Sequence, residues 1–489
     1  MAPMGQFVTI AAHPTRRRSS EIKIADNGTQ DFYDGPDAAV AFISLPQTPH
    51  FWLVNGRIPQ SLLATPVAHC PVIPELAAFP FAENLVAADV EIRDGYITAI
   101  APPQTGPKTV PETVPQVDMQ QGLIWPCFVD IHTHLDKGQS WNRVPNPDGT
   151  FASALDVVQG DAEKYWDRED LYRRMDFSLH CSYAHGTQAL RTHFDAFGSM
   201  AATALEVIHT LRQEWSGRLN LQAASLVSLD YYLTPAGTAL ADQVAAAGAI
   251  LGGVAYTNPD LIAQVDRVFA LAAERGLDLD FHVDESLNPE DQCLRAVAQA
   301  KLRHGFAGRV VCDHCCSLSV QSPEVMGETL KWVREAQIGI ISLPLCNLYL
   351  QDRQPNRMPR YRGVTVLHEL KQWGIPVAIA SDNCRDPFYA YGDLDGLEVF
   401  TQATRIGQLD RPIADWARTV TSTPADLMGL PQAGRIGLGQ SADLVLFKAR
   451  TFNELLSRPQ ADRVVIRQGR SIDTTLPDYR ELDDLVGIA

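Results

Sequence analysis

The chain has 489 residues, of which 45% are apolar and 20% charged, a balance typical of a globular protein with a large core. Its 41 basic and 58 acidic residues give a formal charge of −17, which repels phosphate backbones and argues against a nucleic-acid partner. No apolar run is long enough for a membrane span, and the 9 scattered cysteines do not form a disulfide pattern. We expect a cytoplasmic protein without a membrane partner; a homo-oligomer is compatible with these features.

The first 48 residues differ in composition from the rest of the chain. They are polar, contain several turn signals and show no sustained hydrophobic period. This composition predicts a disordered extension, or a start codon that was assigned too far upstream.

Residues 49–120 and 431–489 both contain strand signals. In the first segment, residues 88–100 alternate between apolar and polar around Asp94-Gly95, a strong hairpin signal. In the second, residues 442–447 and 463–470 form another hairpin-like pair. We expect the two segments to build one small β-sandwich unit.

Residues 121–430 alternate between short β-rich runs and helical stretches. Helical patterns cover residues 260–275 and 323–336, for example. Repeated strand-helix units at this spacing predict an α/β fold with a parallel sheet, and about eight of them close a TIM-like (β/α)8 barrel. The β-rich runs are residues 124–134, 187–192, 219–227, 249–255, 277–282, 309–314, 338–343 and 376–380.

Polar residues stand at the ends of several of these runs. His132 and His134 close the first run, and because alternate residues of a strand face the same side, both imidazoles would enter the barrel mouth. Two converging histidines can bind one divalent metal ion. Three later runs end in residues that bind metals or carry protons, namely His282 with Glu285, Asp313 with His314, and Asp382 with Asn383.

The sequence resembles the amidohydrolase superfamily, and within it the cytosine deaminase family, from about Trp52 to Ser471. Besides the strand ends above, the resemblance includes residues 192–195, 344–351, 362–365 and 386–389. It implies a hydrolase that acts on carbon–nitrogen bonds of a cyclic amidine at a metal centre.

The resemblance also implies the site residues. It places the metal ligands on His132, His134, His282 and Asp382, which would hold one divalent ion per subunit, zinc(II) or iron(II). It places the proton-shuttling glutamate on Glu285 and the histidine beside the attacking water on His314, while Asp382 accepts a proton from that water. The residue types agree, since imidazole suits both metals and a bound metal lowers the pKa of water.

A single ion is favoured over a pair of ions. Dinuclear members of the superfamily bridge two metals with a modified lysine on a middle strand. Between Gly138 and Phe281 the one lysine is Lys164, which lies in a polar, helix-like stretch. His193 follows a strand-like run and is expected in or behind the pocket, but not as a ligand.

The substrate is less defined than the metal site, because residues 226–232 lack the glutamine with which cytosine deaminases bind their substrate. The expected substrate-binding residues are Asn383, Ser228, Asp230, Asp386, Phe388 and Trp141. We expect deamination of cytosine or a close analogue, with release of ammonia. Two alternatives stay open: hydrolysis of an N-alkylated triazine or cyclic amide on the same scaffold, and a catalytically silent, ligand-binding barrel.

Overall fold

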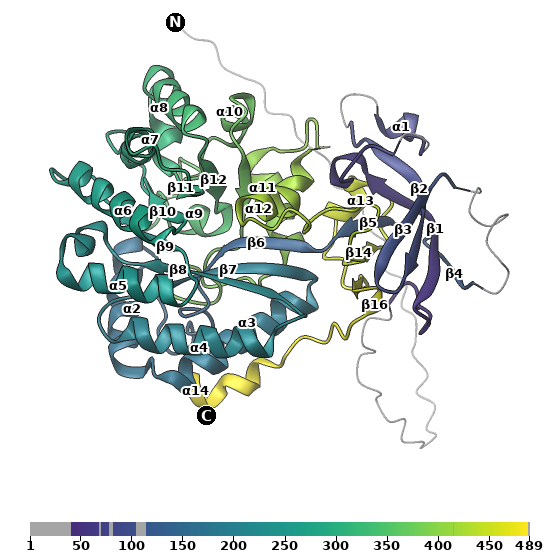
Figure 1. Cartoon of the computed structure of the whole chain (residues 1–489), viewed down its shortest axis with the longest axis horizontal. Helices are drawn as coiled ribbons and strands as arrows, with labels where there is room; N and C mark the ends of the chain where they lie inside the picture. The colour runs from purple at the N-terminus through teal and green to yellow at the C-terminus, as the bar shows by residue number, and fades with distance from the viewer. Residues whose placement is uncertain (1–40, 68–69, 78–81, 104–113, 414, 488–489) are drawn as a thin grey trace, which may run out of the picture. The chain divides into compact units, whose positions relative to one another are not determined.

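The computed structural model describes residues 41–67, 70–77, 82–103, 114–413 and 415–487, which Figure 1 draws in colour. The expected disordered extension therefore lies, up to residue 40, outside the described residues. The described residues form a barrel of parallel strands and a smaller mixed sheet.

The barrel strands are β6 (Phe128–Thr133), β7 (Thr187–Asp195), β8 (Asn220–Leu226), β9 (Leu251–Ala255), β10 (Leu279–Val283), β11 (Val310–His314), β12 (Gly339–Ser342) and β13 (Val377–Ile379). Parallel ladders join β6 to β8 in one sheet and β9 to β13 in another. A bridge between Ser228 and Val254 connects β8 to β9, and a bridge between Thr133 and Asp382 closes the ring. The (β/α)8 barrel expected from the sequence is confirmed.

Helices between the strands cover the outside of the barrel (Figure 1). Their ends follow local sequence signals: the Ser322 hydroxyl accepts a hydrogen bond from the amide of Val325 at the start of α8 (Pro323–Glu335), and α6 (Leu261–Arg275) is followed by Gly276, whose φ is +65°. Each described helix is too short or too polar to cross a membrane.

The α-helices are α1 (Pro74–Ala77), α2 (Phe151–Tyr165), α3 (Arg168–Ala184), α4 (Met200–Glu214), α5 (Pro235–Ala246), α6 (Leu261–Arg275), α7 (Cys293–Arg303), α8 (Pro323–Glu335), α9 (Pro344–Leu350), α10 (Leu367–Gln372), α11 (Gly396–Gly407), α12 (Ser422–Leu427), α13 (Phe452–Leu456) and α14 (Asp483–Val486). Short 3-10 helices span Gln60–Leu62, Leu229–Leu233, Cys316–Val320, Trp416–Val420 and Tyr479–Leu482.

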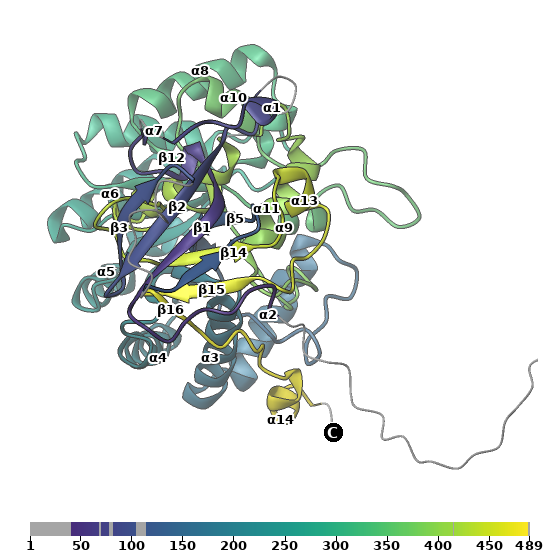
Figure 2. The same ribbon diagram turned by 90° about the vertical axis from the view of Figure 1, so that its right-hand side faces the viewer.

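The small unit is built from both ends of the described chain, as expected (Figure 2). Its strands are β1 (His50–Pro59), β2 (Leu85–Arg93), β3 (Tyr96–Ala101), β4 (Gln116–Asp118), β5 (Leu123–Pro126), β14 (Leu444–Phe447), β15 (Val464–Arg467) and β16 (Arg470–Ser471). They are hydrogen-bonded as one mixed sheet, whereas the expected β-sandwich has two separate sheets. The reason is β1, which pairs with β2 and also with β4 and β5.

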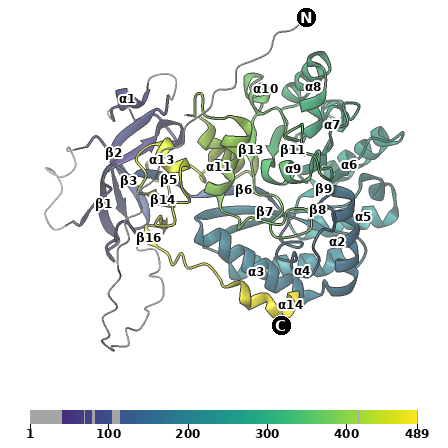
Figure 3. The ribbon, with the colours of Figure 1, turned by 180° about the vertical axis from the view of Figure 1, so that it is seen from behind.

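The junction between sheet and barrel corrects one expected boundary. The sequence assigned residues 121–126 to the barrel, but β5 pairs antiparallel with β14 in the small sheet (Figure 3). The apolar run continues from β5 through Cys127 into β6, so its hydrophobicity does not mark the change of sheet. Trp125 packs there against four aromatic rings, those of Phe128, Phe400, Phe447 and Phe452.

Candidate metal centre and substrate pocket

Four of the sequence-predicted residues converge inside the barrel mouth. His132 lies near the end of β6 with His134 just beyond the strand, His282 lies on β10, and Asp382 follows β13. The Nε2 atom of His134 lies 3.3 Å from Nε2 of His132 and 3.3 Å from Nε2 of His282. Asp382 Oδ1 lies 3.2 Å from Nε2 of His132 and 3.3 Å from Nε2 of His134. All four side chains are buried.

This spacing fits a metal ion better than it fits hydrogen bonding. A tetrahedral site with metal–nitrogen bonds of about 2.0–2.1 Å has ligand atoms about 3.3–3.4 Å apart, close to the observed separations. Burial lowers the pKa of His132 to about 4 and those of His134 and His282 well below the usual range, so the imidazoles are neutral. Neutral imidazole is the form that binds metals.

Asp382 is carried by a strained backbone. Its φ is +66°, in the left-handed region that non-glycine residues seldom adopt, and its amide donates to the His132 carbonyl over 2.9 Å. This turn places the carboxylate beside the histidines. Burial alone would raise the pKa of Asp382, but the adjacent imidazoles of His132 and His134 hold it well below its usual range.

Asp313 lies behind two of the histidines. Its Oδ2 is 3.0 Å from Nδ1 of His132 and 3.4 Å from Nδ1 of His282, while the Nε2 atoms of both rings face the cluster. A carboxylate on the far nitrogen of a metal-binding histidine fixes the orientation and tautomer of the ring. The contact therefore supports the same assignment of Nε2 as the metal-facing atom.

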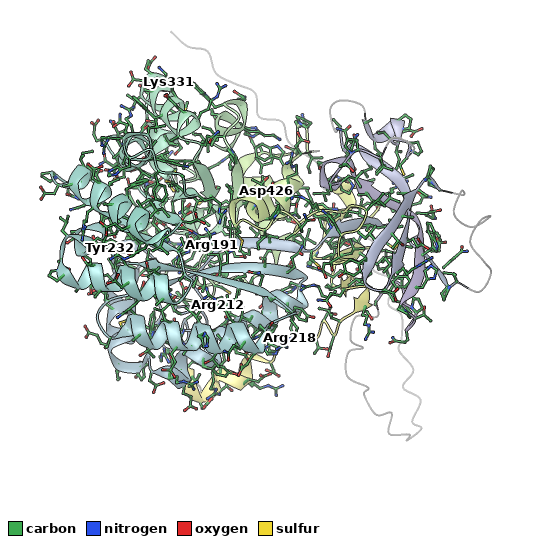
Figure 4. All side chains as sticks on the ribbon, in the orientation of Figure 1. Arg191, Arg212, Arg218, Tyr232, Lys331 and Asp426 are labelled. Atoms are coloured by element: carbon green, nitrogen blue, oxygen red, sulfur yellow. The ribbon has the colours of Figure 1, made fainter. Side chains whose placement is uncertain are left out.

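A further charged layer fills the barrel interior beneath the cluster. His193 Nε2 lies 3.0 Å from Asp280 Oδ1, and Arg191, which Figure 4 labels, donates to Asp280 Oδ2 over 2.8 Å. The His193 ring is 4.1 Å from that of His132, centroid to centroid. Because Arg191 already supplies the positive charge here, this layer is better described as support for the cluster than as a second cation site.

Glu285 and His314 lie together on one side of the cluster. His314 Nδ1 is 3.3 Å from Glu285 Oε1, and the Asn347 amide donates to both, over 3.0 Å to His314 and 3.2 Å to Glu285. Accepting at Nδ1 leaves the His314 proton on Nε2. Burial raises the pKa of Glu285 well above its usual range, with Asp382 adding to the shift, and burial lowers that of His314 to about 3.

A cavity of about 410 Å³ opens onto these groups. His134, His282, Glu285 and His314 form its floor, and its walls are mainly apolar. The wall residues come chiefly from α2, the β7–α4 connection and the ends of β8 and β9: Phe151, Leu155, Gln159, Ala162, Glu163, Phe197, Met200, Leu226, Val227, Val254 and Tyr256.

The expected substrate-binding residues divide into two groups. Ser228, Asn383 and Phe388 line the cavity. Asp386 is buried beside it, where it accepts a hydrogen bond from Asn383 over 2.8 Å. The other two, Asp230 and Trp141, are not among the described residues that line the cavity: Asp230 is exposed, and Trp141 lies beside the Arg385 backbone.

Several residues in or beside the cavity were not named as site residues from the sequence. Asn347, Lys137 and Asp195 stand in or next to the stretches that carry the family resemblance, so that signal was available for them. The apolar face of α2 and Tyr256 carried no such signal. Their place on the wall depends on how the loops above the barrel pack.

Comparison with known proteins decides the family. The model of the amidohydrolase family matches residues 180–475, more than half of the chain. A pterin deaminase from Rhizobium rhizogenes is 48% identical over 448 residues, which cover 91% of this chain and 99% of the relative. The chain belongs to the amidohydrolase family. Amidohydrolases use a divalent metal ion, and this member has a buried His/Asp cluster with the donors for one.

Two other likenesses agree with this amidohydrolase assignment. The N-isopropylammelide isopropyl amidohydrolase of a Pseudomonas strain is 24% identical over 371 residues, or 73% of this chain and 87% of the relative. The structure of 5-methylcytosine deaminase from Klebsiella pneumoniae superposes with a TM-score of 0.73 at 22% identity, covering 88% of this chain and 98% of that one. The latter shows the shared fold, and the resemblance inferred from the sequence is confirmed at the level of the family.

Proposed function

We propose that this amidohydrolase is a metal-dependent deaminase of a small nitrogen heterocycle, and that its substrate is a pterin. The observation that carries the proposal is the 48% identity to a pterin deaminase across nearly the whole of both chains. Cytosine, the ring expected from the sequence, is supported only by the more distant resemblance. A cavity of about 410 Å³ also exceeds what a single pyrimidine ring fills, and it suits a bicyclic pteridine.

His132, His134, His282 and Asp382 would hold one divalent ion, zinc(II) or iron(II). The separations of their donor atoms and the neutral imidazoles support this assignment. Such an ion would polarise a water molecule and lower its pKa toward neutrality. Asp313, which contacts Nδ1 of His132 and His282, would orient those two rings.

In the net reaction the oxygen of water bonds to the ring carbon, the carbon–nitrogen bond to the exocyclic amine breaks, and ammonia leaves. Glu285 would protonate the ring nitrogen beside that carbon and then pass a proton to the departing amine. Its raised pKa suits a group that donates a proton near neutral pH. His314, with its proton on Nε2, would donate a hydrogen bond to the oxygen that adds, while Asn347 holds Glu285 and His314 in register.

A second candidate is hydrolysis of an N-alkylated triazine, favoured by the likeness to the N-isopropylammelide hydrolase. It would use the same floor and release an alkylamine instead of ammonia. The catalytically silent barrel is disfavoured because every position of the expected metal and proton-transfer set is filled and the side chains converge.

Turnover by metal-loaded protein separates these candidates. Pterin, cytosine and N-isopropylammelide would be supplied to the wild type and to the Glu285→Gln variant at equal metal content, and ammonia and isopropylamine measured. We expect the highest kcat/KM for pterin, with ammonia as the product and loss of turnover in the variant. Faster turnover of cytosine or of the triazine would show that this ring, and not pterin, is the substrate. No turnover at full metal occupancy would indicate the silent barrel.

A further inference from the structure

An ion pair interrupts the mainly apolar wall of the cavity. Lys137 Nζ lies 2.6 Å from Asp195 Oδ1, and both residues line the cavity. Their side chains are 5% and 16% exposed, so the pair is largely withdrawn from bulk water. A charged pair in such a place is costly unless its remaining hydrogen-bonding capacity is used.

Asp136 fixes both members of the pair. Its Oδ1 accepts from the Lys137 amide over 2.9 Å, and its Oδ2 accepts from the Asp195 amide over 2.8 Å. The carboxylate therefore ties the end of β7 to the segment that follows β6. This arrangement holds Lys137 and Asp195 in a defined relative position before any ligand arrives.

The pair keeps unused hydrogen-bonding capacity. Asp195 Oδ2 accepts no hydrogen bond from the described residues, since the contact with Lys137 uses Oδ1. The Lys137 ammonium has three protons, of which one goes to Asp195, and a second carboxylate oxygen, Asp136 Oδ2, lies 3.7 Å away. One donor and one acceptor therefore stand side by side for a ligand in the cavity.

We propose that Lys137 and Asp195 recognise the lactam edge of the substrate ring, the adjacent carbonyl and N–H groups. Lys137 donates to the ring carbonyl oxygen, and Asp195 accepts the proton of the neighbouring ring nitrogen. The inference rests on the proposed function and deepens it, because a pterin carries such an edge beside the carbon that bears the exocyclic amine. It defines the substrate class as amino-substituted heterocycles with an intact lactam.

The selectivity should be large because the pocket is mainly apolar. A ring that presents the opposite pattern leaves the charged pair unsatisfied, and sites built on such hydrogen bonds discriminate by factors up to about 10⁴–10⁵. If the pair only ties β7 to the segment after β6, its loss would instead reduce the rates for all rings in parallel.

The test compares pterin with 2,4-diaminopteridine, in which an amine replaces the carbonyl and the neighbouring ring nitrogen has no proton. Both carry the same amine at the reacting carbon, and the product is identified by its substitution there. We expect the metal-loaded wild type to prefer pterin by at least a hundredfold in kcat/KM. A wild type without preference would overturn the proposal, whatever the variants do.

Two variants test whether Lys137 and Asp195 cause the preference for pterin. Asp195→Asn supplies a donor as well as an acceptor and should lower the ratio of kcat/KM for pterin to kcat/KM for 2,4-diaminopteridine at least tenfold. Lys137→Met removes the donor to the carbonyl oxygen and should lower this ratio as well. Metal content should match the wild type in both. Glu206→Gln, which removes a charge from an exposed ion pair with Arg168, is the matched control and should leave the ratio unchanged.

The outcomes for the variants and for the proposed function are distinguishable. If folded, metal-loaded variants lose kcat/KM for pterin and for 2,4-diaminopteridine in parallel, so that their ratio is unchanged, the pair does not recognise the lactam edge. Binding of pterin to the wild type without turnover would contradict the proposed function alone, and the same ratios would then be measured as Kd by calorimetry. Neither binding nor turnover of pterin would overturn both.

Discussion

The floor and the wall of the cavity are built in opposite ways. The floor, together with the metal-ligand cluster, consists of histidines and carboxylates at the ends of barrel strands, each in contact with another polar group. The wall comes largely from α2 and from the connections above the barrel, and it is apolar apart from a few polar positions. The contrast indicates that the floor determines the reaction, whereas the wall determines which ring is accepted.

The largest effect is expected when a metal ligand is removed from the floor. His282→Asn should leave the protein with less than one metal ion per chain and lower kcat by at least about 10³-fold, since metal polarisation is worth several kcal/mol. Metal analysis and steady-state kinetics on the same sample test this. His209→Asn, at an exposed helical position, is the control; full metal occupancy in His282→Asn would remove His282 from the ligand set.

Proton transfer on the floor should be separable from metal binding. Glu285→Gln keeps the shape of the side chain but cannot cycle a proton, so kcat should fall by about 10²–10⁴-fold while the metal stays bound. Kinetics at measured metal content test this. A loss of less than about tenfold would show that another group carries the proton.

Removing the Asp313 carboxylate, which lies behind two of the histidines, should have a smaller effect. Asp313→Asn weakens the contacts to Nδ1 of His132 and His282, and such orienting partners are worth about 10–100-fold in metal affinity or activity. Metal affinity from a competition titration and kcat at saturating metal separate the two contributions. Unchanged values for both would mean that Asp313 does not orient the rings.

A substitution in the wall should weaken substrate binding and leave the chemical step unchanged. Phe388 lines the cavity and packs against Phe151 with ring centroids 5.5 Å apart. Phe388→Ala should raise KM for pterin about tenfold through lost apolar contact, with kcat and metal content nearly unchanged. Met358→Ala, at an 82% exposed position, should change neither; a collapse of kcat in Phe388→Ala would place this ring in the chemistry.

Much of the barrel could be predicted from the sequence because each strand and helix has its own local period. The expected run at residues 309–314 corresponds to β11, and the helical pattern at 260–275 corresponds to α6. The transition from β5 to β6 could not be predicted in this way. Both strands are buried and apolar, and only their hydrogen-bonding partners, β14 and β7, distinguish them.

The site shows the same contrast between what the local sequence pattern predicts and what tertiary packing decides. The floor residues and the metal ligands lie at strand ends, so barrel geometry alone brings His132, His282 and Asp382 to one mouth. The wall depends on how α2 and the loops pack over that mouth, which local pattern does not encode. Asp230 illustrates the limit, because it follows β8 closely in sequence yet faces solvent.

The most direct test of the central claim is product analysis in water labelled with oxygen-18. Metal-loaded protein would be incubated with pterin, and the ring product and ammonia quantified together by mass spectrometry and an ammonia assay. The account predicts 2,4-dioxopteridine carrying one labelled oxygen and one equivalent of ammonia. Recovery of unchanged pterin from protein with full metal occupancy, or a product without the label, would contradict it.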